Sequence, residues 1–232
     1  MSNIRIISSM ATRHLLTDLI HQFKGQNSCE ISLESVGGVV AAQRIEQGEK
    51  FDVVILASNA IDSLIKKGAV VTGTRTDIVS SGMAIAVSSQ HIGIDVSGAD
   101  LVKQAVLNAK TIGYSTGPSG TYLLKLFEEW GIASQLEYRL IKAAPGIPVG
   151  DMIASGQVEI GFQQLSELIT CDGINILGAL PEEIQLNTLF SVGIPSTAKL
   201  TTDLMEFIAY LNSAESYLLK SKHGMTPVPQ AG

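Results

Sequence analysis

The stretch SVGGVVAAQRIEQGEKFDVVILAS, residues 35–58, contains the pattern that decides the fold class. It opens with a turn that holds two glycines, and VVAAQRIEQGEK then has the composition of a helix. The segment FDVVILA follows as a continuous apolar run, which is typical of a strand buried on both faces. A turn, a helix and a doubly buried strand in this order predict an α/β fold with a mainly parallel sheet.

The order of strand, turn and helix recurs along the chain. IRIISSM, residues 4–10, reads as a short strand, and the apolar residues from Leu15 to Phe23 then lie on one helical face. GYSTGPSGTYLLKLFEEWG, residues 113–131, joins a turn of small residues to a helix with an apolar stripe. A second set of elements opens at GMAIAVSS, residues 82–89. The pattern therefore predicts two sets of α/β elements.

Composition limits the kind of partner that the protein can have. The chain has 232 residues, of which 45% are hydrophobic, so it can bury a sizeable core. Its net charge of −6 argues against a broad surface for nucleic acid or for an anionic membrane, and any anion site must be local. No apolar run reaches the length of a membrane span. We expect a small-molecule partner, with no nucleic acid and no membrane insertion.

Several other chemistries find no support in the sequence. Cys29 and Cys171 are too few for a disulfide framework or a zinc cluster, so two free thiols are expected, with a single bridge as the alternative. The four histidines are scattered, and the sequence lacks the phosphate-binding, dinucleotide-binding and hydrolase motifs. We expect neither a metal nor another cofactor.

The first residues, MSNIRIISSM, lack the basic region and the apolar core of a signal peptide. The expected location of the chain as written is the cytoplasm. If a leader was removed from it, the expected location is the periplasm.

Three strand-to-helix turns carry the candidate ligand-binding groups, because ligands of parallel sheets bind beyond the carboxyl ends of the strands. The third turn opens a helix that has no acidic residue until Glu128, and a bare helix N-terminus of this kind attracts anions. The candidate residues of the three turns are Ser8, Ser9, Met10, Gly37, Gly38, Ser115, Thr116, Ser119 and Gly120. These turns predict an anion site.

Each turn also has an interpretation without a ligand. The hydroxyls of the third turn can simply cap its helix, and the glycines of the second can serve backbone sterics alone. Gln163 and Gln164 end another predicted strand, whose alternation directs one side chain toward the site and the other away. The loop Ala144–Gly150, with Val149 near its end, could offer backbone N–H groups or only shape the turn.

Arg13 is the sharpest local clue. A cation in the first turn of a helix opposes the helix dipole by about 0.3–1 kcal/mol, so its placement calls for compensation. Arg13 can pair with Asp18 or Glu34, reach solvent, or bind a ligand carboxylate through a bidentate contact. His14 and Glu34 are the two side chains of this region that could act as a catalytic base.

The order of these segments, with GPSGTYLLKLFEEWGI in the middle and GDMIASGQVEIGF later, resembles the bacterial solute-binding proteins of the molybdate-binding type, which have a type II periplasmic-binding-protein-like fold. The resemblance covers residues 3–228. It implies two α/β lobes, each with a mainly parallel sheet flanked by helices, joined by two crossing strands that act as a hinge. Residues 1–82 plus 191–232 would form lobe one and residues 83–190 lobe two, with a small anion bound in the cleft.

The sequence departs from the molybdate pattern at two places. The second turn, VGGVV, has no Ser or Thr, and Gln stands in GFQQLSE where the pattern has a tyrosine. GFQQLSELI and GPSGTYLL look more like a divergent branch of the superfamily that includes aconitate isomerase, an enzyme that moves a double bond in a tricarboxylate.

Together these features predict a receptor or sensor for a small organic anion, such as a di- or tricarboxylate. The alternative is a cytoplasmic carboxylate isomerase of the aconitate isomerase type, with His14 or Glu34 as base. A molybdate-binding transport component is the third possibility. A transporter permease is an expected partner only if the protein is exported.

Overall fold

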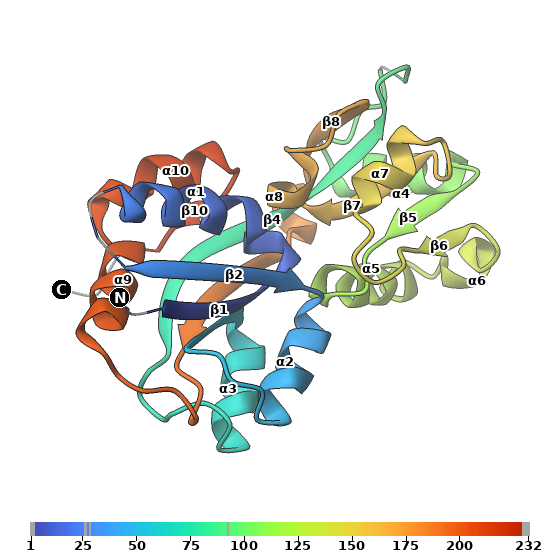
Figure 1. Cartoon of the computed structure of the whole chain (residues 1–232). Coiled ribbons are helices and arrows are strands. Elements are labelled where there is room, and N and C mark those ends of the chain that lie inside the picture. Colours follow the sequence, from blue (N-terminus) through green and yellow to red (C-terminus); the bar gives the residue numbers. More distant parts are fainter. Residues whose placement is uncertain (1–2, 26, 28, 92, 229–232) are drawn as a thin grey trace. The chain divides into compact units, whose positions relative to one another are not determined.

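The structure is a computed structural model, and it describes residues 3–25, 27, 29–91 and 93–228. Both halves of the chain are mixed α/β, as predicted (Figure 1). Contacts divide the chain into two compact units: unit 1 comprises Met1–Ser81 and Leu189–Gly232, and unit 2 comprises Gly82–Thr188.

Unit 1 is built on three parallel strands at its edge. The strand β1 pairs with β2 on one side and with β3 on the other, and β9 runs antiparallel to β3. The strands of unit 1 are β1 (Asn3–Ser9), β2 (Glu30–Val36), β3 (Val53–Ala57) and β10 (Thr226–Pro227), together with β9 (Asn187–Gly193), whose first two residues belong to unit 2. The helices of unit 1 are η1 (Met10–Thr12), α1 (Arg13–Lys24), α2 (Gly38–Glu46), α3 (Ser58–Lys66), α9 (Thr202–Leu211), η3 (Ala214–Ser216) and α10 (Tyr217–Lys222).

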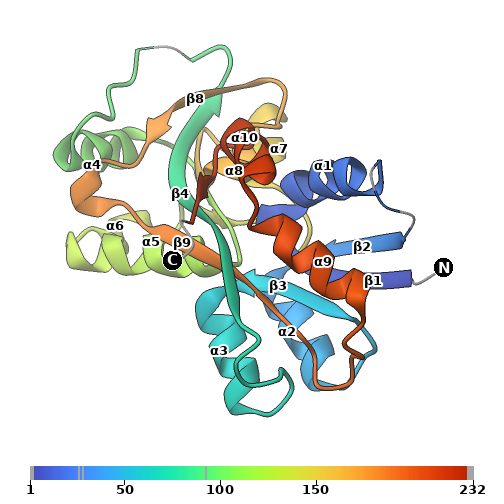
Figure 2. The same ribbon diagram turned by 90° about the vertical axis from the view of Figure 1, so that its left-hand side faces the viewer.

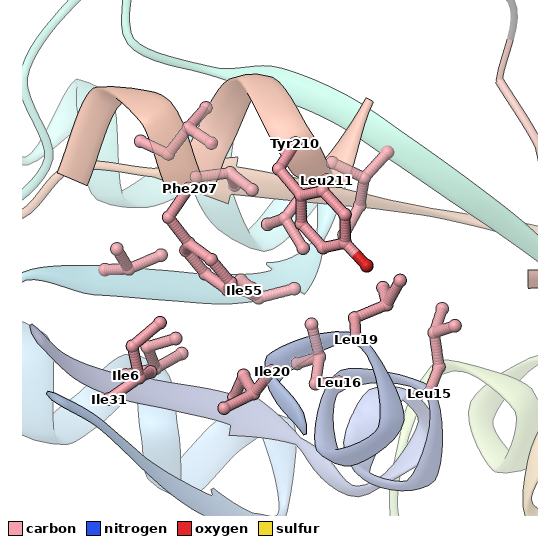
Figure 3. Packing of buried hydrophobic residues seen from close by; sticks show 14 of the residues in the cluster. Ile6, Leu15, Leu16, Leu19, Ile20, Ile31, Ile55, Phe207, Tyr210 and Leu211 are labelled. Carbon is pink, nitrogen blue, oxygen red and sulfur yellow. The ribbon is translucent and has the colours of Figure 1, made fainter. Parts of the chain in front are cut away.

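Helices cover both faces of the unit 1 sheet, which explains the continuous apolar run in β3. The helices α2 and α3 lie on one face, and α1 and α9 lie on the other (Figure 2). Along β3, Val54 and Leu56 pack with α2 and α3, whereas Val53 and Ile55 pack with α1 and α9. Figure 3 shows Phe207 of α9 above Ile55. The strands are therefore buried on both sides, and their carboxyl ends are left as the place where polar groups can meet a ligand.

Unit 2 repeats this plan with different helices. The strand β5 pairs in parallel with β6 and β7, and Tyr114 lies opposite Phe162 in register. The strands confined to unit 2 are β5 (Ile112–Tyr114), β6 (Leu140–Lys142), β7 (Ile160–Gln164) and β8 (Ile174–Ala179). Its helices are α4 (Ala99–Asn108), α5 (Pro118–Glu129), α6 (Ala133–Leu136), α7 (Val149–Ala154), α8 (Leu165–Leu168) and η2 (Glu182–Ile184).

The long strand β4 (Thr76–Ser88) runs through the boundary between the units. Its first part pairs with β10 in unit 1, and its second part pairs with β7 and β8 in unit 2. The hydrogen-bonded path of strands is β2-β1-β3-β9-β4-β7-β5-β6. The sheets that the sequence predicts for each half are therefore continuous through the shared strand β4.

Among the helices of the described residues, none combines the length and the apolar character that crossing a membrane requires.

Candidate ligand-binding site

The two serines at the end of β1 have different surroundings. The Ser8 hydroxyl is fully buried and lies 2.8 Å from the Ser35 hydroxyl of β2, so it is already bonded within unit 1. The Ser9 side chain is 8% exposed, and its Oγ atom has no hydrogen-bond partner among the described residues. A buried polar atom left without a partner costs about 1–3 kcal/mol. Of the pair, Ser9 is the one with a hydroxyl available for a ligand.

Arg13 and His14 begin α1 just beyond Ser9, and both side chains are exposed. Asp18 binds His223, with 2.9 Å between its Oδ2 and Nε2 of the histidine, and Glu34 binds Arg44. Both acids that the sequence offers to Arg13 are thus engaged elsewhere, and within the described residues Arg13 forms no ion pair. The first turn of α1 has no acidic residue, so the Arg13 guanidinium remains available to an anion.

The two candidate bases differ in their electrostatics. Partial burial of the imidazole lowers the pKa of His14 below its ordinary value, and the neighbouring Arg13 lowers that pKa further. Arg44 donates to Glu34 from two of its three guanidinium nitrogens, Nη1 and Nη2, and the bond from Nη2 to Oε2 measures 3.0 Å. This pairing lowers the pKa of Glu34 and makes it a weaker base. Of the two, His14 has the neutral form that a base needs near pH 7.

An open groove of about 500 Å³ lies beside these residues in unit 1, between α1 and β2. Arg13 and Glu34 line it together with apolar side chains, among them Ile31 and Leu33. The groove therefore offers a charged rim and an apolar wall.

The turn before α2 contains two glycines that the fold itself does not require. Gly37 has a φ of −55°, and a Cβ built there would meet no atom within 4 Å. A Cβ on Gly38 would lie 3.8 Å from Ser9 Cβ, which is ordinary van der Waals contact. The structure thus brings Gly38 next to Ser9, and neither the backbone nor the packing accounts for the missing side chains.

In unit 2, the hydroxyls before α5 do not cap the helix. Gly117 is the N-cap residue and Pro118 the first helical residue, and the helix has no side-chain cap hydrogen bond at this end. The Ser115 and Ser119 hydroxyls instead bond each other at 2.8 Å, and Thr116 is exposed. The hydroxyls of this turn therefore do not act as a simple N-cap. Among the described residues, no side chain accepts a hydrogen bond from the backbone N–H groups at the start of α5.

Gly120, which the sequence suggested as a ligand-binding residue, has a packing role in the structure. A Cβ at this position would lie 1.9 Å from the Ser115 carbonyl oxygen, so only glycine fits here. Gly120 lets the helix start close to the preceding strand, and this requirement alone explains the residue.

The paired glutamines at the end of β7 are both buried and bond different partners. Gln163 accepts a hydrogen bond from the Val149 N–H at 2.8 Å and donates one to Glu167 at 2.8 Å. Gln164 donates to the Thr188 hydroxyl at 2.8 Å. The Val149 N–H is therefore already bonded within unit 2.

Glu167 is a residue of this region that the sequence analysis missed. It lies in the short helix α8, directly after β7, and its side chain is half-buried. Burial raises its pKa to about 7, while the hydrogen bond from Gln163 acts in the opposite direction. The signal in the sequence that could have identified it is an acid four residues after Gln163, in GFQQLSE.

The described residues contain no cluster of three or more His, Cys, Asp or Glu side chains placed to hold a metal ion. Cys29 and Cys171 are both free thiols, so the alternative of a single bridge is not realised.

The candidate groups thus form one set in each unit. In unit 1 the set comprises Ser9, Arg13, His14 and the Gly37-Gly38 turn, and in unit 2 it comprises the start of α5 and the Gln163–Glu167 pair. Both sets lie where strands end and helices begin. Hydroxyls, a guanidinium and uncapped N–H groups are all hydrogen-bond donors, so they are suited to an anion.

Comparison with known proteins agrees with this architecture. Residues 4–226 match the family model of the bacterial extracellular solute-binding proteins, and the chain belongs to this family. It resembles the molybdate-binding, type II branch in particular. The chain is 33% identical to an aconitate isomerase from a Pseudomonas species over 189 residues, which cover 80% of this chain and 71% of that protein.

Two molybdate binders are more distant relatives. The chain is 25% identical to the molybdate-binding protein ModA of Azotobacter vinelandii over 179 residues, which cover 73% of this chain and 70% of that protein. The solved structure of a periplasmic molybdate-binding protein of Azotobacter vinelandii matches with a TM-score of 0.81 and 16% identity, covering 98% of this chain and all of that one. At this identity the structural match supports the shared two-lobed fold.

Proposed function

We propose that this protein binds a small organic anion that carries two or three carboxylates. The observation that carries the proposal is the pairing of two unmet donors at one strand end: the buried Ser9 hydroxyl without a partner and the Arg13 guanidinium without an acid. A planar carboxylate matches the fork of a guanidinium and gives a bidentate charge-assisted contact.

The second turn supports an organic ligand rather than a tetrahedral oxyanion. Gly37 and Gly38 leave open space beside Ser9, and no hydroxyl stands there to bond an oxyanion. The next two residues, Val39 and Val40, are 60% and 40% exposed, so the entrance to α2 is apolar. A carboxylate on a carbon skeleton has both the charge for Arg13 and the apolar surface for this turn.

A thermal-shift screen tests the proposal. Di- and tricarboxylates, with aconitate among them, are compared with molybdate, tungstate and sulfate. A ligand present at 100 times its Kd should stabilise the protein by about 2.7 kcal/mol. Stabilisation by carboxylates supports the proposal, and stabilisation by molybdate alone rejects it in favour of an oxyanion transport component with a permease as partner.

A second candidate function is isomerisation of such a ligand. Two observations favour it: the 33% identity to an aconitate isomerase and the Glu167 carboxyl, which is protonated to a substantial degree near pH 7. Isomerisation removes a proton beside a carboxylate, shifts the double bond and returns a proton at the far carbon. Proton NMR of the protein with cis- or trans-aconitate separates the two functions, because a binding protein leaves the spectrum of the ligand mixture unchanged with time.

A further inference from the structure

We propose that the Glu167 carboxyl, held by Gln163 at the end of β7, binds a ligand carboxylate as a neutral acid, so that anion binding takes up a proton. This inference rests on the proposed function and adds to it a binding group in unit 2 and a coupling to pH.

The Gln163 amide fixes one oxygen of Glu167. Gln163 is 2% exposed, and its Oε1 atom accepts the Val149 N–H, which can only donate. Its amide nitrogen must therefore point the other way, where it donates to Glu167 Oε1 over 2.8 Å. Because Oε1 already accepts this bond, a proton on Glu167 belongs on Oε2. That oxygen can then donate to an incoming carboxylate.

Burial, rather than a neighbouring charge, favours the protonated form of Glu167. Within the described residues no cation bonds this carboxyl, and its side-chain partner is the neutral Gln163. The helix α7, which packs against α8, brings Asp151, and the segment after α8 brings Cys171 and Asp172. All three of these groups are acidic, and burial raises the pKa of the Cys171 thiol to about 11, so it stays neutral. None of them can stabilise a negative charge on Glu167.

The position of Glu167 in unit 2 suits a ligand contact. Since β5 and β7 are parallel neighbours with Tyr114 opposite Phe162, Ser115 and Gln163 leave the sheet at the same edge. Ser119 and Glu167 each follow four residues later on the helix that starts there. The hydroxyl pair before α5 and the acid after β7 therefore belong to one edge of unit 2, and the side chain of Glu167 is only partly buried, so part of it remains accessible.

A neutral acid and a carboxylate form a strong hydrogen bond, whereas two carboxylates repel each other. Above the pKa of Glu167, about 7, the free protein has lost this proton and must recover it from solvent when the anion binds. Between pH 6 and pH 8 the affinity of the wild type should therefore fall by about tenfold. A variant with a permanent neutral donor at this position should show no such fall.

The experiment is calorimetric titration with aconitate at pH 7.5 in two buffers that differ in their heat of ionisation. The wild type should take up most of one proton. Glu167→Gln, which keeps a donor but cannot titrate, should bind with no uptake and with the same Kd at pH 6 and pH 8. Asp151→Asn, a change to an exposed acid on the neighbouring helix α7, is the matched control and should retain the uptake.

Two outcomes overturn the inference while leaving the proposed function intact. One is proton uptake that persists in Glu167→Gln. The other is a Glu167 carboxyl that titrates near 4.3 in the ligand-free protein, as followed by 13C NMR of labelled glutamate. If the wild type binds none of the carboxylates, the proposed function itself fails, and this inference fails with it.

Discussion

The hydroxyl oxygens of Ser115 and Ser119 lie 2.8 Å apart at the start of α5. Each hydroxyl has one hydrogen to donate, and one shared bond uses only one of the two. The pair therefore keeps a hydrogen that can be directed to a third group. In a plain cap this hydrogen-bonding capacity would be directed at the helix itself, yet no side chain caps α5.

Ser119→Ala should weaken binding of the organic anion about threefold to tenfold, because the pair loses the hydrogen that it can offer to a ligand. Loss of the internal bond should lower the free energy of unfolding by about 1 kcal/mol. Calorimetry with the best ligand of the screen and chemical denaturation measure the two effects. Thr121→Ala, which removes an exposed hydroxyl from the same helical turn, is the control and should leave the affinity unchanged. Equal affinities in the wild type and Ser119→Ala would remove this turn from the site.

Arg13→Ala should weaken carboxylate binding by about 1.5–3 kcal/mol, the range for hydrogen bonds to charged groups. The melting temperature should stay constant or rise, because an exposed cation with no acid partner at a helix N-terminus does not stabilise the fold. Arg13→Lys separates charge from shape, since lysine keeps the charge and loses the bidentate fork. We expect it to recover part of the lost affinity, and full retention of affinity in Arg13→Ala would return Arg13 to a solvent role.

Much of the fold could be predicted because the pattern of burial is visible in the sequence. The continuous apolar run of β3 is buried at every position, and the stripe of α1 packs inward from Leu15 to Phe23. The short or half-buried elements were missed, among them α4, β6 and β8. Every residue of β8 is half-buried or exposed, so INILGA carries little of the alternation by which strands are identified.

For the candidate site, the sequence allows predictions only from local patterns. The three turns follow directly from strand and helix ends, and their residues could be named. Glu167 could not, because its pKa depends on burial by segments distant in sequence and on the Val149–Gln163 bond that orients its partner. Likewise, the pairing of Glu34 with Arg44 depends on how β2 and α2 pack, so the sequence alone does not predict it. Because Glu34 is paired with Arg44, it does not pair with Arg13.

Gly38→Ala should raise the stability of the protein and lower its affinity for the ligand, whereas Ser119→Ala should lower both. The new methyl group would meet Ser9 Cβ at 3.8 Å without strain, and replacing glycine in a helix stabilises by about 0.4–1 kcal/mol where the conformation is compatible. If a ligand approaches this turn closely, the affinity should nevertheless fall. Gly48→Ala is the contrasting control: its φ of +77° makes the substitution destabilising, with no effect expected on affinity. A Gly38→Ala variant with both greater stability and unchanged affinity would place the ligand elsewhere.

The last prediction concerns Lys220, a fully buried lysine of α10 in unit 1. Its Nζ atom has no hydrogen-bond partner among the described residues and lies 5.3 Å from the centre of the Tyr217 ring. Burial disfavours the charged amine and lowers its pKa from the ordinary 10.5 to about 8. Folding below pH 8 therefore requires a charged amine to be buried.

Lys220→Met should thus stabilise the protein at pH 7, and the sign follows from proton binding. Between pH 8 and 10.5 the unfolded chain holds a proton on Lys220 that the folded chain has released, so the free energy of unfolding of the wild type rises with pH across this window. Below pH 8 the whole penalty applies, about 3 kcal/mol at about 1.36 kcal/mol for each pH unit between the two values. Methionine has a similar length and no charge, so its advantage should be largest at pH 7 and should shrink between pH 8 and pH 10.5, where the folded wild type has released the proton of Lys220. Urea denaturation of the two proteins at pH 7 and pH 10 measures the difference, and Lys222→Met, a change to an exposed lysine of the same helix, is the matched control. A stability difference between wild type and Lys220→Met that does not change with pH would mean that the Lys220 amine is paired or solvated in the folded protein.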